Sequence, residues 1–96
     1  MKEKKIAILG LGYVGLPLAL QLSLSYNVIG YDVDNTRIKE LRKGIDKTLE
    51  VSESLLKKQQ KKSLFFTTRS KDIFNCNFYI ATVPTPIDSR KKPDFF

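Results

Sequence analysis

A short glycine-rich segment near the start of the chain has the composition and spacing of a phosphate-binding turn. Residues 10–15 have the sequence GLGYVG, which matches the pattern G-x-G-x-x-G. In such a turn Gly10 permits the sharp bend after a strand, Gly12 lets the backbone approach a pyrophosphate, and Gly15 lets the next helix pack closely on the sheet. The free N–H groups and the positive dipole end of that helix then face the phosphates. Glycine-rich turns also occur for purely structural reasons, so the motif alone does not establish binding.

A carboxylate at a suitable distance along the chain strengthens the case for a dinucleotide. Asp32 follows Gly10 by 22 positions, and in dinucleotide-binding units an acidic residue about 20 positions further on binds the ribose hydroxyls. Because a carboxylate repels a 2′-phosphate, Asp32 favours NAD over NADP as the cofactor. The structural alternative is that Asp32 only begins a turn or caps the following helix.

The elements that must position these residues alternate between strand and helix. Apolar, partly β-branched runs predict the strands, and capped or leucine-rich stretches predict the helices between them. We expect strands at 5–9, 27–31, 64–67 and 78–83, and helices at about 13–26, at 34–43, from 52 onwards, and as a short turn at 71–75. This alternation is typical of a parallel α/β sheet. Residues 1–96 are therefore predicted to be the N-terminal part of a Rossmann-type doubly wound α/β domain, with about four strands.

The predicted topology brings a second segment to the glycine turn. In a doubly wound sheet the first and fourth strands are neighbours, and the ligand crevice opens where the strand order reverses between them. Residues 82–86 (TVPTP) should therefore emerge beside the turn, where two prolines would stiffen the loop and Thr85 could supply a hydroxyl. A rigid strand exit without a ligand role explains the same residues equally well.

Composition restricts the other chemistries that the chain could carry. Cys76 is the single cysteine and there is no histidine, so the chain has neither a disulfide framework nor a Cys/His metal site, and a lone thiol suits a reducing cytoplasm. The net charge of +7 would permit an anionic partner. A further hypothesis is that lysines within 57–62 bind nucleic acid together with Phe65 and Phe66. No recognition motif accompanies them and the two aromatics fall in an expected core strand, so we expect no nucleic-acid partner.

The opening of the chain imitates a targeting signal. Basic residues within 1–5 precede a mostly apolar stretch at 6–24. The glycines of residues 10–15 and Pro17 would weaken a helix through that stretch, and polar residues fall where a membrane-spanning helix should still be apolar. We therefore expect no membrane partner and a cytoplasmic location.

Taken together, these segments resemble the N-terminal domain of the UDP-glucose/GDP-mannose dehydrogenase family. The resemblance spans essentially the whole chain and rests on KIAILGLGYVGLPLAL, on DVDNTRI from Asp32, on GIDKTLEVS from Gly44, and on ATVPTPID from Ala81. It is closest to members that oxidise UDP-N-acetylglucosamine or UDP-N-acetylgalactosamine at C6 for bacterial surface polysaccharides. The cofactor-binding residues nominated by the motif and the resemblance are Gly10, Leu11, Gly12, Tyr13, Val14, Gly15, Asp32, Arg37 and Thr85.

The resemblance implies a role for each part of this set. The backbone of residues 12–14 would contact the pyrophosphate, Asp32 would hold the adenosine ribose with Arg37 alongside it, and Thr85 would lie near the nicotinamide ribose. Without the family match, Arg37 is most simply interpreted as an exposed helix residue.

The resemblance also implies which parts of an enzyme lie elsewhere. Family enzymes perform two successive NAD-dependent oxidations through a covalent thiol adduct, and their catalytic cysteine, lysine, asparagine and aspartate lie far downstream of the matched region. Cys76 does not correspond to that nucleophile and is expected to be a small buried residue. Where the family continues PDLTP, residues 93–96 are PDFF, which indicates a truncation or a disrupted reading frame.

We therefore expect the NAD-binding portion of a nucleotide-sugar 6-dehydrogenase. By itself the 96-residue chain should be catalytically inactive, with UDP-sugar binding and homo-oligomerisation confined to the full-length enzyme. The alternative is a stand-alone nucleotide-binding module without catalysis.

Overall fold

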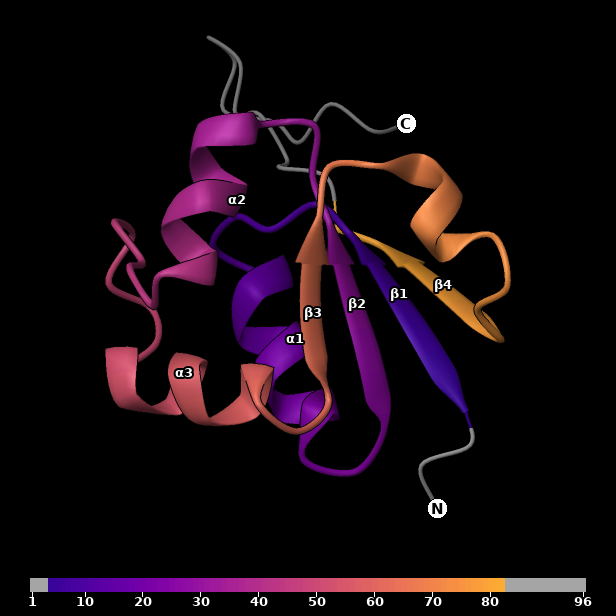
Figure 1. Cartoon of the computed structure of the whole chain (residues 1–96), viewed down its shortest axis with the longest axis horizontal. Helices are drawn as coiled ribbons and strands as arrows, with labels where there is room; N and C mark the ends of the chain where they lie inside the picture. Colours follow the sequence, from indigo (N-terminus) through magenta and orange to yellow (C-terminus); the bar gives the residue numbers. More distant parts are fainter. Residues whose placement is uncertain (1–3, 83–96) are drawn as a thin grey trace, which may run out of the picture.

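A computed structural model describes residues 4–82 of the chain. Four strands within these residues form one parallel sheet in the order β3-β2-β1-β4. Figure 1 shows α2 and α3 to the left of the strands and η1 to the right, beside β4. In chain order the elements are β1 (Lys5–Leu9), α1 (Gly15–Ser23), β2 (Asn27–Tyr31), α2 (Asn35–Arg42), α3 (Glu53–Gln60), β3 (Leu64–Thr67), the short 3-10 helix η1 (Ser70–Ile73) and β4 (Phe78–Ala81).

The strand order confirms the predicted Rossmann-type arrangement. β1 lies in the interior of the sheet, where Ala7 pairs with Ile29 of β2 on one side and with Tyr79 of β4 on the other. The chain moves outward from β1 to β2 and β3 and then crosses back to β4, so the strand order reverses between β1 and β4. Because parallel strands end at the same edge, the segments that follow β1, β2 and β4 meet there.

Local sequence signals account for where two of the helices begin. The Asp34 carboxylate accepts a hydrogen bond from the N–H of Arg37 at 3.1 Å and caps α2. The Ser52 hydroxyl accepts one from the N–H of Leu55 at 3.2 Å and caps α3. Each cap satisfies an N–H group that a helix start leaves without an intrahelical acceptor. The α1 start has no such side-chain cap at its N-cap residue Val14, which leaves its first N–H groups available.

One apolar core joins the three α-helices to a single face of the sheet. Alternate residues of the strands provide one half of this core, because successive strand side chains point to opposite faces. Leu11, from the glycine turn, is also fully buried, so the turn is anchored in the core. The core residues are Ile6, Ile8, Leu11, Leu16, Ala19, Leu20, Val28, Ile38, Leu41, Leu56, Leu64 and Phe66.

The structure differs from the sequence expectations in a few details. The first helix covers Gly15–Ser23 rather than 13–26, because the chain turns toward β2 directly after Leu24. β4 ends at Ala81, and Val83 lies outside the described residues. Phe65 was expected in the core and is half exposed, because it points to the sheet face opposite the three helices.

The close packing of β2 beneath Phe66 generates a stability prediction. A Cβ on Gly30 would lie 2.8 Å from Cδ1 of Phe66 and 3.0 Å from Cδ2 of Leu11. We predict that Gly30→Ala lowers the free energy of unfolding by about 1–3 kcal/mol, the usual cost of overpacking a core. Chemical denaturation measures this, with Gly12→Ala as the matched control because a Cβ at Gly12 meets no atom within 4 Å. Equal destabilisation by both substitutions would contradict the prediction.

Candidate functional site

The glycine turn leaves β1 at the edge of the sheet where β2 also ends. Gly10 has a φ of +102°, a left-handed conformation that residues with a side chain rarely adopt. Its N–H donates to the carbonyl of Tyr31, the last residue of β2, at 2.8 Å. A Cβ on Gly10 would also lie 2.8 Å from the carbonyl oxygen of Thr82. Gly10 therefore makes the tight turn that the motif predicts.

Packing also explains the glycine at position 15, but it does not explain the glycine at position 12. A Cβ on Gly15 would overlap the carbonyl oxygen of Gly10 and the hydroxyl of Thr82, so only glycine allows α1 to begin this close to β1 and β4. A Cβ on Gly12, by contrast, meets nothing within 4 Å. The missing side chain of Gly12 therefore leaves open space beside the turn, as close approach of a ligand to the backbone would require.

The start of α1 presents backbone donors at this open space. Among residues 4–82, no protein oxygen accepts a hydrogen bond from the N–H groups of Gly12, Tyr13 or Val14. The side chains of Tyr13 and Val14 are exposed by 68% and 69%, so this stretch of backbone is at the surface. Free N–H groups at the positive end of a helix dipole attract anions, and phosphates in particular.

The Asp32 carboxylate lies against the glycine turn, as the spacing predicts. One of its oxygens accepts a hydrogen bond from the N–H of Leu11 at 2.9 Å, and the other accepts one from the N–H of Asp34 at 3.0 Å. The contact with Asp34 is the one expected if Asp32 only begins a turn. Asp32 therefore supports the fold whether or not it binds a ligand. Each carboxylate oxygen can still accept a further hydrogen bond, such as one from a ribose hydroxyl.

Arg37 is not the exposed helix residue that its position in α2 alone suggested. Only 11% of its side chain is exposed. Its Nε donates to the carbonyl of Leu11 at 2.8 Å, and its Nη1 donates to Asp46 at 2.9 Å. The buried Nη2 has no hydrogen-bond partner within the described part of the chain. Arg37 thus holds the glycine turn and leaves one buried donor unsatisfied.

The other partner of Arg37 is Asp46, which sequence reasoning missed. Burial by itself would raise the pKa of this carboxyl, but hydrogen bonds from the Thr48 hydroxyl, from Arg37 and from the amides of Glu50 and Thr48 outweigh burial and lower the pKa to about 2. An Asp soon after a helix-ending glycine commonly accepts N–H groups of the turn that follows, and this signal was available. Nothing in the sequence indicates the contact with Arg37.

Thr82, the first residue after β4, lies beside the glycine turn, as the topology predicts. The Thr82 hydroxyl donates to the carbonyl of Gly10 at 2.7 Å, and the Thr82 N–H donates to the carbonyl of Leu9 at 2.8 Å. The sequence placed Thr82 beside the turn as part of 82–86, but we expected the hydroxyl role at Thr85, which lies outside the described residues. The turn is therefore fixed by a side chain from β4 as well as by β2 and α2.

These groups fit a dinucleotide. The free amides of α1 suit a pyrophosphate, the space beside Gly12 lets it approach, and the Asp32 carboxylate suits ribose hydroxyls. The unsatisfied Nη2 of Arg37 adds a polar donor next to the same turn. Together with the parallel sheet and its reversal between β1 and β4, this arrangement defines a dinucleotide-binding domain of the Rossmann type.

Sequence comparison establishes the family within that class. Residues 4–96 match the model of the UDP-glucose/GDP-mannose dehydrogenase family, NAD binding domain, and the chain belongs to this family. The match confirms the predicted family, and it confirms NAD as the cofactor of this domain.

Individual relatives agree with this assignment. The chain is 51% identical over 94 residues to a UDP-N-acetyl-D-glucosamine 6-dehydrogenase of Pseudomonas aeruginosa, covering 98% of the chain and 22% of that protein. It is 52% identical over 92 residues to the enzyme of the same name from Salmonella typhi, covering 96% and 21%. Among solved structures, the UDP-D-ManNAc dehydrogenase of Pyrococcus horikoshii has a TM-score of 0.83 at 36% identity over 94% of the chain and 22% of its own. The chain thus spans about a fifth of the length of these relatives.

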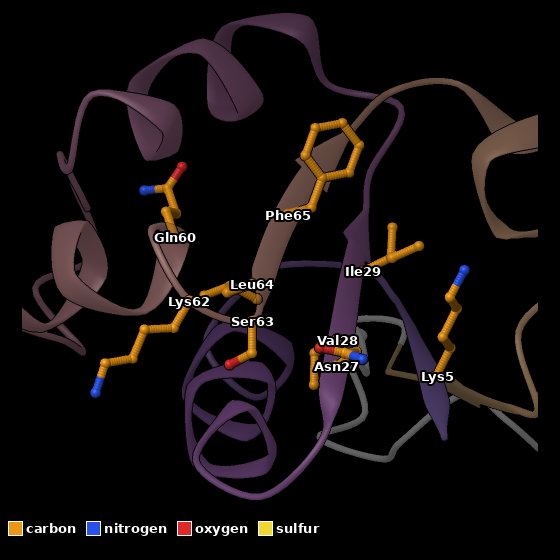
Figure 2. A pocket seen from close by; sticks show the side chains of 9 residues that line it. All are labelled: Lys5, Asn27, Val28, Ile29, Gln60, Lys62, Ser63, Leu64 and Phe65. Carbon is orange, nitrogen blue, oxygen red and sulfur yellow. The ribbon is translucent and has the colours of Figure 1, made fainter. Parts of the chain in front are cut away.

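A cavity of about 260 Å³ lies where the strands begin, at the edge of the sheet opposite the glycine turn (Figure 2). Its lining includes Lys5, Asn27 and Leu64, the first residues of β1, β2 and β3, whereas the glycine turn follows the last residue of β1. Figure 2 shows the side chains of Lys5 and Lys62 pointing away from each other. The two lysines therefore do not converge on an anion, and this cavity is separate from the dinucleotide site.

The remaining reactive groups of residues 4–82 do not form a second centre. Cys76 was expected to be buried and is half-buried; burial raises the pKa of its thiol, against an opposing effect of the charge on Lys5. Within residues 4–82, no group of three or more His, Cys, Asp or Glu side chains could hold a metal ion. In the same part of the chain, no helix has the length and apolar composition needed to cross a bilayer.

The lowered pKa of Asp46 predicts how stability depends on pH. Its folded-state pKa of about 2 lies below the ordinary value of 3.8, so its contribution is complete above about pH 4 and is lost as the pH falls through about 2. This difference corresponds to about 2 kcal/mol in the free energy of unfolding. Urea denaturation at a series of acidic pH values should show a shallower loss for Asp46→Asn than for the wild type. Identical pH dependence of the two proteins would contradict the assignment.

Proposed function

We propose that the chain binds NAD at the glycine turn and forms the cofactor-binding portion of a nucleotide-sugar 6-dehydrogenase. The observation that carries this proposal is the placement of the Asp32 carboxylate on the N–H of Leu11, at 2.9 Å, directly beside the free amides that begin α1. A ribose-binding acid and a pyrophosphate-binding helix start are thereby adjacent. This adjacency is the arrangement that dinucleotide recognition requires.

Each part of the site has a role in this proposal. The amides of Gly12, Tyr13 and Val14 donate to the pyrophosphate, and Asp32 accepts hydrogen bonds from the adenosine ribose. Arg37 lies alongside that ribose and fixes the turn, and Thr85 contacts the cofactor near the nicotinamide ribose. Gly10, Leu11 and Gly15 give the turn its shape. NAD, when bound, supplies the hydride acceptor for the oxidation.

The substrate part of the proposal is supported by the relatives. Two proteins that are 51% and 52% identical to the chain are named UDP-N-acetyl-D-glucosamine 6-dehydrogenases. We infer that the full-length enzyme oxidises the C6 hydroxyl of a UDP-N-acetylhexosamine to a uronic acid for polysaccharide biosynthesis. It would do so in the cytoplasm and as a homo-oligomer, and the sugar nucleotide would bind only to the full-length protein.

NAD binding is tested directly by isothermal calorimetry on the 96-residue chain. Asp32→Ala should weaken NAD binding by about ten- to a hundredfold, because the ribose loses hydrogen bonds to a charged acceptor. Gly12→Val should abolish binding while leaving the melting temperature near that of the wild type, because its side chain enters space that no protein atom occupies. Glu50→Gln, at an exposed acid, is the charge-matched control. Tight NAD binding by Gly12→Val would overturn the proposed site.

The proposal also predicts that the 96-residue chain does not catalyse the oxidation alone. None of its residues corresponds to the catalytic cysteine, lysine, asparagine or aspartate that the family resemblance implies. Incubation with NAD and UDP-N-acetylglucosamine should produce no NADH above background, with the full-length Pseudomonas aeruginosa relative as the positive control. Steady NADH production by the short chain would show that catalytic groups lie within it.

A further inference from the structure

Asp46 is a buried carboxylate that none of the proposed NAD contacts uses. Its side chain is 1% exposed. One oxygen accepts hydrogen bonds from Arg37 Nη1 at 2.9 Å, from the N–H of Thr48 at 3.0 Å and from the Thr48 hydroxyl at 2.6 Å. The other accepts from the N–H groups of Glu50 and Val51 at 2.8 and 3.1 Å. Apart from Arg37, every donor to Asp46 lies in the loop between α2 and α3.

The bond from Arg37 connects this loop to the cofactor turn. The same guanidinium donates through Nε to the carbonyl of Leu11 at 2.8 Å. The N–H of Leu11 in turn donates to Asp32 at 2.9 Å. An unbroken series of polar contacts therefore runs from Asp46 through Arg37 and Leu11 to the proposed ribose-binding carboxylate.

Without Asp46, neither Nη1 nor Nη2 of Arg37 would have a hydrogen-bond partner among the described residues. Arg37 Nη2 has no partner there, and Nη1 bonds only to Asp46. A guanidinium that is held through Nε alone can rotate and move away from the Leu11 carbonyl. A carboxylate that is bonded to both Nη1 and the loop removes that freedom before a ligand arrives.

We propose that Asp46 is a positioning residue of the cofactor site. It fixes Arg37, and Arg37 holds the Leu11 carbonyl so that the glycine turn keeps the geometry that binds NAD. The inference rests on the proposed NAD function of the glycine turn. Asp46 acts through Arg37 and does not touch the cofactor.

An Asn at position 46 cannot reproduce this arrangement. Both carboxylate oxygens accept hydrogen bonds from N–H donors. In either orientation the amide NH₂ would face donors, either those of Arg37 and Thr48 or those of Glu50 and Val51. In both orientations Asp46→Asn loses N–H contacts and removes the negative charge that faces Arg37, with little change in side-chain volume.

A double-mutant cycle in NAD affinity tests the proposal on the 96-residue chain. Asp46→Asn should weaken NAD binding by about tenfold, the size expected for a charge-assisted hydrogen bond. In an Arg37→Ala background the same change should have almost no further effect, because its route to the turn is absent. A merely structural role would give additive losses. Thr48→Val, which removes a loop contact of Asp46 without touching Arg37, should leave the affinity close to that of the wild type.

The outcomes separate this inference from the function on which it rests. Wild-type affinity in folded Asp46→Asn, or losses that add in the double mutant, would overturn the positioning role while NAD binding stands. If Asp46→Asn does not fold, Asp46→Glu provides the test, and failure of both to fold would replace the positioning role with a folding role. If the folded wild type binds no NAD, the proposed function fails. Hydrogen exchange of the Leu11 amide in the free chain then decides the inference: faster exchange in Asp46→Asn but not in Thr48→Val supports it, and unchanged exchange overturns it.

Discussion

The backbone of Leu11 is held at both its N–H and its carbonyl, and the geometry of the whole site depends on this double restraint. Asp32 accepts its N–H and Arg37 donates to its carbonyl, at 2.9 and 2.8 Å, while the Leu11 side chain is buried in the core. A glycine-rich turn has many accessible conformations, and fixing them costs conformational entropy. Because protein contacts already impose the conformation, a ligand that binds the turn does not have to impose it.

The restraint is possible because the fold brings separate elements to one edge of the sheet. β1 leads into the turn, β2 ends at Asp32, α2 carries Arg37, and β4 delivers Thr82 to the carbonyl of Gly10 at 2.7 Å. The strand order reverses between β1 and β4, which is the place where doubly wound sheets bind their ligands. Packing alone accounts for glycine at positions 10 and 15, whereas a Cβ at Gly12 would meet no atom within 4 Å. The fold thus holds the turn at Gly10 and Gly15 and leaves open space beside Gly12.

Sequence patterns with a fixed spacing were sufficient to predict the sheet and the motif. The strands at 5–9, 27–31 and 64–67 have the predicted bounds, because short apolar runs bounded by polar residues leave little choice. The spacing from Gly10 to Asp32 correctly placed the carboxylate at the turn. Contacts made by long side chains across the fold could not be predicted in this way. Arg37 was interpreted without the family as exposed, and Asp46 was missed, because their pairing depends on where the loop after α2 returns in space.

We expect the glycine turn and the start of α1 to receive the diphosphate of NAD. Amide chemical shifts of the ¹⁵N-labelled chain, followed during addition of NAD, test this most directly. The largest changes should fall on Gly12, Tyr13 and Val14, with a second group at Asp32 and its neighbours. Shifts confined to the amino ends of the strands, around the cavity lined by Lys5 and Asn27, would contradict it.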